Sequence, residues 1–197
     1  ARGKKFSSLK NIPDKILMPS ACAALYRRQL IEQIGFFDES FFAYCEDSDL
    51  GLRARVAGWE ARLAEKAVVY HKYSATAGSF SPFKLYLVER NHFWAALKTF
   101  PPVLLLLLPL TTLFRYVFQA LVILRGTGSG NMILQTADAK ACLFAVIRGF
   151  WHGLRNPFPI LKKRREFLKR CHAGSYRLSR LIIKHRMNFS ELLDARR

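Results

Sequence analysis

The feature that most constrains the fold is a long apolar run in the second half of the chain. Residues 103 to 108 are all apolar, and residues 110 to 124 contain few polar side chains. A helix that spans a bilayer needs about 20 mostly apolar residues, and this run has that length. Pro109 and Arg115 interrupt it, and an arginine at the bilayer centre costs about 2.5–3.5 kcal/mol. The run therefore predicts a membrane-associated helix, either spanning or bent and lying in the interface.

Two further features of the second half also favour a membrane. The shorter segment 141–154 contains Arg148 and His152 and has the composition of an amphipathic helix at headgroup level. The tail that follows is basic, with the run Lys162-Lys163-Arg164-Arg165. Basic residues beside apolar helices mark the cytoplasmic side and attract anionic lipid, by about 1 kcal/mol per charge. We therefore expect residues 101–197 to form a hydrophobic and basic helical region on the cytoplasmic face of the cell (inner) membrane.

The charge of the chain limits its partners. It carries 32 Lys and Arg against 14 Asp and Glu, a net charge of +18. This excess indicates an anionic partner, which is a nucleic acid, an anionic membrane surface or a phosphorylated substrate. No recognition helix, RNP-like strand or zinc finger occurs in the sequence, which disfavours nucleic acid. The four cysteines are far apart and form no CxxC pair, so they support neither a zinc knuckle nor a disulfide framework.

Residues 1 to about 80 have the alternating short elements of an α/β or α+β domain. The pattern predicts a helix between Ser20 and Gly35 and a second, short helix that starts at Asp47 or Ser48 and ends at Gly58. It also predicts a strand at 67–71 and a long helix from Ser81-Pro82 towards Pro101-Pro102. We expect an α/β domain that is followed by membrane-associated helices.

Three acidic residues, Glu46, Asp47 and Asp49, lie within four positions of this basic chain. They fall at the predicted start of the second helix. There the helix dipole and the unpaired backbone N–H groups stabilise carboxylate charge and favour the base-competent form. The alternative is a solvated helix start in which the acidic residues act only as caps. The cluster is therefore a candidate site for general-base chemistry.

Five short motifs occur along the first half, in this order: Ala23-Ala24-Leu25-Tyr26-Arg27-Arg28, Gly35-Phe36-Phe37-Asp38-Glu39, residues 41–50 around the acidic cluster, Gly58-Trp59 and Val69-Tyr70-His71. Together they resemble the second half of a family 2, GT-A type glycosyltransferase, in particular the bacterial rhamnosyltransferase-like members that build surface polysaccharides. The resemblance covers about residues 15 to 100. It implies that residues 1–100 are the C-terminal half of a GT-A (nucleotide-diphospho-sugar transferase) catalytic domain. No Asp-x-Asp precedes the acidic cluster, so we expect the nucleotide-binding half to lie upstream in a longer protein.

The resemblance assigns roles to the acidic cluster. In such enzymes the Glu-Asp pair supplies the general base that takes the proton of the acceptor hydroxyl, while that hydroxyl attacks the anomeric carbon with inversion. Asp47 is then the base, and Glu46 orients the acceptor or the donor sugar. An inverting displacement needs one carboxylate within reach of the acceptor and no covalent nucleophile. Asp49 either contacts substrate, caps the helix or holds Arg53 one turn later.

Further candidates follow from the same resemblance. Cys22 and Ala23 fall in a small-residue stretch that lets the backbone approach the donor sugar, and Arg53 joins Asp49 as a substrate-binding candidate. In several GT-A enzymes a histidine at the position of His71 helps to hold a divalent cation at the donor diphosphate, where Mg²⁺ or Mn²⁺ suits the oxygen ligands. A structural, hydrogen-bonded histidine is the alternative. Arg90-Asn91 matches a recurrent Glu-Arg-Asn and faces either phosphate or lipid headgroups, or else lies on an exposed helix face.

The sequence therefore predicts an inverting glycosyltransferase that moves a sugar from a nucleotide-sugar donor to a glycan or lipid-linked acceptor in cell-surface polysaccharide synthesis. The expected partners are this donor, this acceptor and an anionic membrane surface, without nucleic acid. Two alternatives remain. One is a non-catalytic membrane-anchoring or scaffold module, and the other is a basic nucleic-acid-binding protein.

Overall fold

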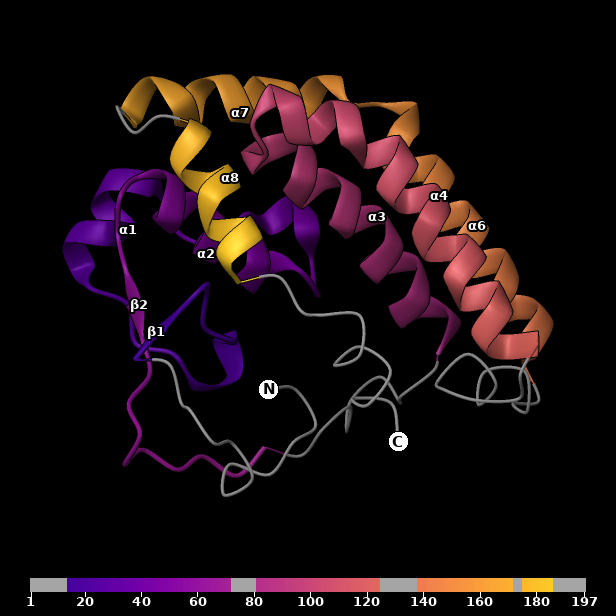
Figure 1. Ribbon diagram of the computed structural model, residues 1–197, viewed down its shortest axis with the longest axis horizontal. Coiled ribbons are helices and arrows are strands. Elements are labelled where there is room, and N and C mark those ends of the chain that lie inside the picture. The colour runs from indigo at the N-terminus through magenta and orange to yellow at the C-terminus, as the bar shows by residue number, and fades with distance from the viewer. Residues whose placement is uncertain (1–13, 72–80, 125–137, 172–174, 186–197) are drawn as a thin grey trace.

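The computed structural model describes residues 14–71, 81–124, 138–171 and 175–185, and most of these residues are helical (Figure 1). The elements, in chain order, are β1 (Lys15–Ile16), the 3₁₀ turn η2 (Ala21–Ala23), α1 (Arg28–Ile34), the 3₁₀ turn η3 (Glu39–Phe41), α2 (Glu46–Val56), β2 (Ala61–Arg62), α3 (Pro82–Thr99), α4 (Pro102–Leu124), α6 (Ala139–Arg155), α7 (Phe158–Arg170) and α8 (Ser175–Lys184). Within the described residues, the sheet consists of β1 and β2, which pair antiparallel. So small a sheet does not test the predicted GT-A half-domain, which stays a prediction.

The helix that starts at the acidic cluster forms as expected, with small shifts at its ends. Helix α2 begins at Glu46, one residue before the predicted cap Asp47, and ends at Val56. Its first turn carries all three acidic residues of the cluster, where the helix dipole favours negative charge. Gly58, with φ of 96°, follows the helix end, and this left-handed backbone favours glycine.

Helix α3 also forms as the sequence predicted, from Pro82 to Thr99. The Ser81 side chain accepts a hydrogen bond from the backbone N–H of Lys84, and Pro82 occupies the first helical position. The helix ends at Thr99, just before Pro101, because the residue that precedes a proline is disfavoured in helical backbone.

Two local predictions in the first half were wrong. The helix that was expected between Ser20 and Gly35 is shorter, because α1 starts only at Arg28 and the side chain of Leu25 is fully exposed. The strand expected at 67–71 does not form, and Tyr70 is 96% exposed. β-branched and aromatic residues favour a strand only where a neighbour pairs with it, and β2 pairs with β1 instead.

One hydrophobic core joins the first and the last helices of the described part of the chain. Leu50 and Val56 of α2 pack with Phe167 of α7 and Leu178 of α8, all of them buried. Burying side chains of this kind contributes about 1.5–3 kcal/mol each. Side chains from before and after the predicted domain boundary near residue 100 therefore share one core.

A second packed region is formed by α3, α4 and α6 (Figure 1), which are joined by contacts between α3 and α6, between α3 and α4 and between α4 and α6. Phe93 of α3 contacts the ring of Phe150 of α6 at 5.1 Å between centroids, and Leu108 of α4 packs against Phe93. Helix α6 comes very close to α3 at Gly149, where a Cβ atom would lie 2.5 Å from the Tyr86 carbonyl oxygen. Only glycine permits this approach.

The outward faces of α4 and α6 expose many apolar side chains, and α6 also exposes Arg148. We call this set the apolar surface, and its members are Val103, Leu106, Leu107, Leu110, Leu113, Phe114, Val117 and Leu121 on α4 and Leu143, Phe144, Ile147, Trp151 and Leu154 on α6. Of the helices in the described part of the chain, none combines the length and the apolar character that crossing a bilayer requires.

The close contact at Gly149 gives a first testable prediction. Gly149→Val should lower the free energy of unfolding by about 1–3 kcal/mol, because the added side chain overlaps the α3 backbone. Urea denaturation followed by circular dichroism measures this loss. Ala141→Val, on the exposed side of α6, is the matched control and should change stability by less than about 0.5 kcal/mol. Equal losses in the two variants would contradict the packing described here.

Candidate active site

The acidic pair follows a turn with unusual backbone geometry. Phe42, Tyr44 and Cys45 have positive φ values of 63°, 67° and 64°, although none of them is glycine. Each such residue costs on the order of 1–3 kcal/mol, and it persists only where surrounding contacts hold it. We call residues 41–45 the strained turn. Its last residue is the N-cap of α2, so the turn sets where Glu46 and Asp47 lie.

Two side chains of α3 hold the strained turn. The Asn91 amide nitrogen lies 2.9, 2.8 and 2.7 Å from the carbonyl oxygens of Phe41, Ala43 and Tyr44. Arg90 also donates to the Phe41 carbonyl, at 3.1 Å. Asn91 is fully buried, so both environments expected for it, a phosphate or lipid headgroup and an exposed helix face, were wrong. The Glu-Arg-Asn motif was recognised in the sequence, but its Arg90 and Asn91 donate hydrogen bonds to the protein's own backbone.

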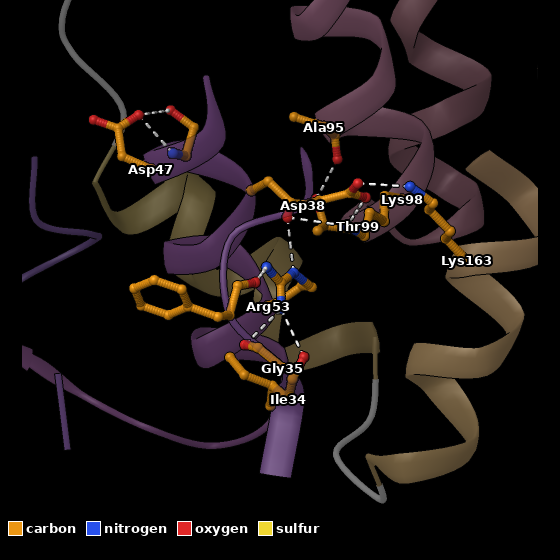
Figure 2. A network of polar contacts seen from close by, with 12 residues as sticks. Ile34, Gly35, Asp38, Asp47, Arg53, Ala95, Lys98, Thr99 and Lys163 are labelled. Atoms are coloured by element: carbon orange, nitrogen blue, oxygen red, sulfur yellow. Dashed lines mark hydrogen bonds and ion pairs between the residues drawn. The ribbon is translucent and has the colours of Figure 1, made fainter. Parts of the chain in front are cut away.

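Asp47 lies at the first turn of α2, on the side of the helix away from the buried ion pairs (Figure 2). One of its carboxylate oxygens accepts a hydrogen bond from the backbone N–H of Ser48 at 2.7 Å. The other accepts from the backbone N–H of Ala21 at 3.4 Å. The turn η2, which contains the predicted donor-binding residues Cys22 and Ala23, therefore lies beside the predicted base.

Glu46 and Tyr26 complete the immediate surroundings of Asp47. Burial raises the pKa of Glu46, and the neighbouring charge of Asp47 raises it further. Burial also raises the pKa of Tyr26, followed by the charges of Asp47 and Glu46. Within the described residues, Glu46 Oε2 and the Tyr26 hydroxyl are both buried and have no hydrogen-bond partner. A buried polar atom without a partner is unusual in a folded protein, which makes both groups candidates for a role at the site. Tyr26 was not predicted as a site residue, although it lies in the first of the five motifs.

Cys45, next to the acidic pair, is unsuited to act as a nucleophile. Burial, followed by the charges of Asp47, Glu46 and Glu89, raises the pKa of its thiol to about 12. Because the thiolate is the nucleophilic form of cysteine, this group stays protonated and inert at neutral pH.

Asp49 and Arg53 point into the protein. Arg53 donates to Asp49 at 2.8 Å, and its guanidinium also donates to the carbonyl oxygens of Ile34 and Phe36 at 2.6 and 2.7 Å (Figure 2). The side chains of Asp49 and Arg53 are 0% and 3% exposed. The predicted contact one helical turn apart is confirmed, and it joins α2 to the end of α1. Substrate binding by these two residues stays a prediction.

Asp38 extends this network to α3 and α7. It closes an Asx-type turn by accepting from the backbone N–H of Ser40 at 3.1 Å. It also accepts from Lys98 at 2.7 Å and from Lys163 at 2.6 Å, and Lys98 reaches Asp49 as well, at 3.0 Å. Burial opposes ionisation of Asp38, but the hydrogen bonds from Lys163, Lys98 and Ser40 outweigh it and hold its pKa far below the usual value.

His71 lies exposed at the end of the described segment 14–71. In the described parts of the chain, no three or more His, Cys, Asp or Glu side chains gather in a way that could hold a metal ion. His71 supplies one ligand and therefore does not by itself fit Mg²⁺ or Mn²⁺, which take about six oxygen ligands. The predicted metal role of His71 stays a prediction.

Comparison with known proteins gives a partial match to a glycosyltransferase. Over 84 residues the chain is 34% identical to N-acetylglucosaminyl-diphospho-decaprenol L-rhamnosyltransferase from two strains of Mycobacterium tuberculosis. The match covers 38% of this chain and 27% of the relative, so the chain spans about a quarter of the curated relatives it matches. No family model and no solved structure matches. The similarity relates the chain to glycosyltransferases and leaves its specific role to proposal.

The lowered pKa of Asp38 gives a pH-dependent prediction. A carboxyl whose pKa falls on folding stabilises the protein above its unfolded pKa, about 3.9, and loses this contribution as the pH falls towards its folded pKa. Asp38→Asn should therefore lower the free energy of unfolding by about 3 kcal/mol at pH 7. The difference from the wild type should shrink progressively below about pH 4.

Urea titrations at several pH values measure this difference. Asp14→Asn is the matched control, since Asp14 is exposed and forms an exposed ion pair with Arg62 at 3.5 Å. It should cost less than about 1 kcal/mol at every pH. A loss in Asp38→Asn that stays constant down to pH 2 would contradict the role of the ionised carboxylate.

Proposed function

We propose that this chain is part of an inverting glycosyltransferase that moves a sugar from a nucleotide-sugar donor to a lipid-linked or glycan acceptor in cell-surface polysaccharide synthesis. The observation that carries the proposal is the placement of the acidic pair. The strained turn presents Glu46 and Asp47 beside η2, while the third carboxylate, Asp49, is turned into the core. Asp47 is thus half-buried and available for chemistry, whereas Asp49 is fully buried and pairs with Arg53 of the same helix.

In the proposed reaction Asp47 is the general base. The acceptor hydroxyl donates its proton to the Asp47 carboxylate while its oxygen attacks the anomeric carbon of the donor sugar. The bond between that carbon and the diphosphate breaks, and the nucleoside diphosphate leaves with the electron pair. Hydrogen bonds from the backbone N–H groups of Ser48 and Ala21 orient the carboxylate, and proton transfer to a positioned base of this kind contributes about 10²–10⁴-fold in rate.

Glu46 and Tyr26 have a second role in this proposal, which is to orient a sugar. Their unpartnered oxygens lie close to Asp47, and sugar hydroxyls both donate and accept hydrogen bonds. Burial raises the pKa of Glu46, and its unpartnered oxygen can accept a hydrogen bond from a sugar hydroxyl. A divalent cation at the donor diphosphate, as the resemblance implies, would need ligands in addition to His71. None of the steps above uses it.

The substrates are proposed from the relative. Its name specifies an L-rhamnosyl group and an N-acetylglucosaminyl-diphospho-decaprenol acceptor. We therefore take a nucleotide-activated L-rhamnose and this acceptor as the first substrates to test. An acceptor that carries a polyprenyl chain lies in a membrane, which links the proposed reaction to the apolar surface.

We further propose that the apolar surface rests on the cytoplasmic face of the inner membrane. Arg115, which interrupts the apolar run, is directed inward, because its guanidinium donates to both carboxylate oxygens of Glu89 at 2.8 and 2.7 Å. The outward face of α4 therefore stays uncharged. Exposed apolar patches of this extent mark interaction sites. Helix α7, which follows α6, exposes Lys162, Arg165 and Lys169. Their charges complement anionic lipid headgroups.

The catalytic proposal has a direct test. In the full-length protein, Asp47→Asn should lower kcat for rhamnosyl transfer to N-acetylglucosaminyl-diphospho-decaprenol by about 10²–10⁴-fold, because the amide cannot accept the proton. A radiolabelled donor and extraction of the lipid product measure the transfer. Asp14→Asn, the same chemical change at an exposed carboxylate, should keep the wild-type rate. Near-normal transfer by Asp47→Asn would refute the assignment, and a purely anchoring module would transfer no sugar in any form.

The membrane proposal is tested by sedimentation with vesicles. The double variant Leu106→Asp and Leu113→Asp should bind phosphatidylglycerol vesicles at least about tenfold more weakly than the wild type, since each buried leucine contributes about 1.5–3 kcal/mol. The matched control Leu25→Asp and Val69→Asp changes two exposed apolar residues outside the apolar surface and should bind normally. Equal binding by both double variants would contradict the proposal. So would a first double variant that becomes monomeric while its vesicle binding is unchanged, because a second copy of the chain would then be what covers the apolar surface.

A further inference from the structure

We propose that Asn91 is a positioning residue of the active site, which acts by holding the strained turn in the conformation that presents Glu46 and Asp47. This inference rests on the proposed function, because it concerns the same acidic pair. Arg90 and Asn91 then bind the protein's own backbone, in the turn that precedes the acidic pair.

The Asn91 amide is oriented so that its nitrogen faces the strained turn. An asparagine side chain has two N–H donors, and Asn91 directs them at three converging carbonyl oxygens, those of Phe41, Ala43 and Tyr44, all within 2.9 Å. The carbonyl oxygen of the same amide accepts from Arg90 at 2.9 Å. This contact fixes which end of the amide faces the turn, since only the nitrogen end can donate.

Arg90 is itself held in place by aromatic rings of α3. Its guanidinium lies 4.3 Å from the ring centroid of Trp94 and 5.5 Å from that of Tyr86, distances typical of cation–π contacts. Side chains on successive turns of one rigid helix therefore orient Arg90, Arg90 orients the Asn91 amide, and the amide holds the turn.

The backbone of the turn explains why this clamp is needed. Three residues of the turn have positive φ values without being glycine, so the turn by itself would relax to negative φ. Such a relaxation would rotate the peptide planes directly before Glu46 and displace both carboxylates. Displacing a catalytic group by about 1 Å can cost about 10²-fold in rate. The loss should therefore appear in kcat more than in substrate binding.

The variant Asn91→Asp tests this inference, because it keeps the size of the side chain and replaces the two N–H donors with acceptors. Thr99→Val is the matched control. Thr99 is also a buried polar residue of α3, but it donates only to the Ala95 carbonyl of its own helix (Figure 2). Arg90→Ala is a second variant, which removes the contact that orients the Asn91 amide. Because Arg90 is only half-buried, this variant is expected to fold even if Asn91→Asp does not.

The measurements are kcat and KM for rhamnosyl transfer to N-acetylglucosaminyl-diphospho-decaprenol, hydrogen–deuterium exchange of the amides of residues 42–46, and Tm. We expect kcat to fall about 10–100-fold in Asn91→Asp and about tenfold in Arg90→Ala. KM for the donor should stay within about threefold, and exchange at 42–46 should accelerate at temperatures well below Tm. Thr99→Val should lower Tm similarly and leave kcat and this exchange unchanged.

Two results would overturn the inference. One is a kcat in folded Asn91→Asp or Arg90→Ala that is no lower than in Thr99→Val. The other is unchanged exchange at 42–46, which would mean that Asn91 does not hold the turn. Failure of the proposed function is seen separately, as a wild-type protein that transfers no sugar, and the exchange measurement still tests the clamp in that case.

Discussion

The structure depends first on one buried cation, Lys98 of α3, which lies between the carboxylates of Asp38 and Asp49. Arg53 binds the same Asp49 and caps the last carbonyl groups of α1. A buried charge is stable only when it is paired and hydrogen-bonded, so these groups specify one another's positions. The network joins α1, α2 and α3, and through Lys163 also α7. The network fixes the position of α2, whose first turn carries the half-buried acidic pair Glu46 and Asp47.

Helix α3 connects the two working parts of the molecule. Its residues 90 and 91 hold the strained turn, whereas Glu89 binds Arg115 of α4, and Tyr86 hydrogen-bonds His152 of α6 at 3.0 Å. The apolar surface and the acidic pair are thus attached to one rigid element. In the proposed function, this arrangement holds the candidate base at a constant position relative to the lipid surface in which a polyprenyl-linked acceptor would lie.

Much of the candidate site could be predicted from local sequence, and the rest could not for identifiable reasons. The acidic first turn of α2, the Asp49–Arg53 contact and the Asx-type turn at Asp38 depend on residues only a few positions apart, so their signals are local. Tyr26 and Asn91 reach the site from 20 and 45 or more residues away along the chain, and nothing in their neighbourhood indicates which carbonyl or carboxylate they approach. The sequence showed Arg115 only as an interruption of an apolar run, because the partner that neutralises its charge, Glu89, belongs to another helix.

The sequence by itself determined the helices with strong end signals, the acidic character of the candidate site and the apolar, basic nature of the second half. Those properties follow from side-chain chemistry and short-range spacing. The tertiary structure decided which of the three carboxylates are buried and which remain available, how the first and last helices share one core, and where the strained turn is held. These outcomes depend on contacts between distant segments, whose energies are realised only when the chain is folded.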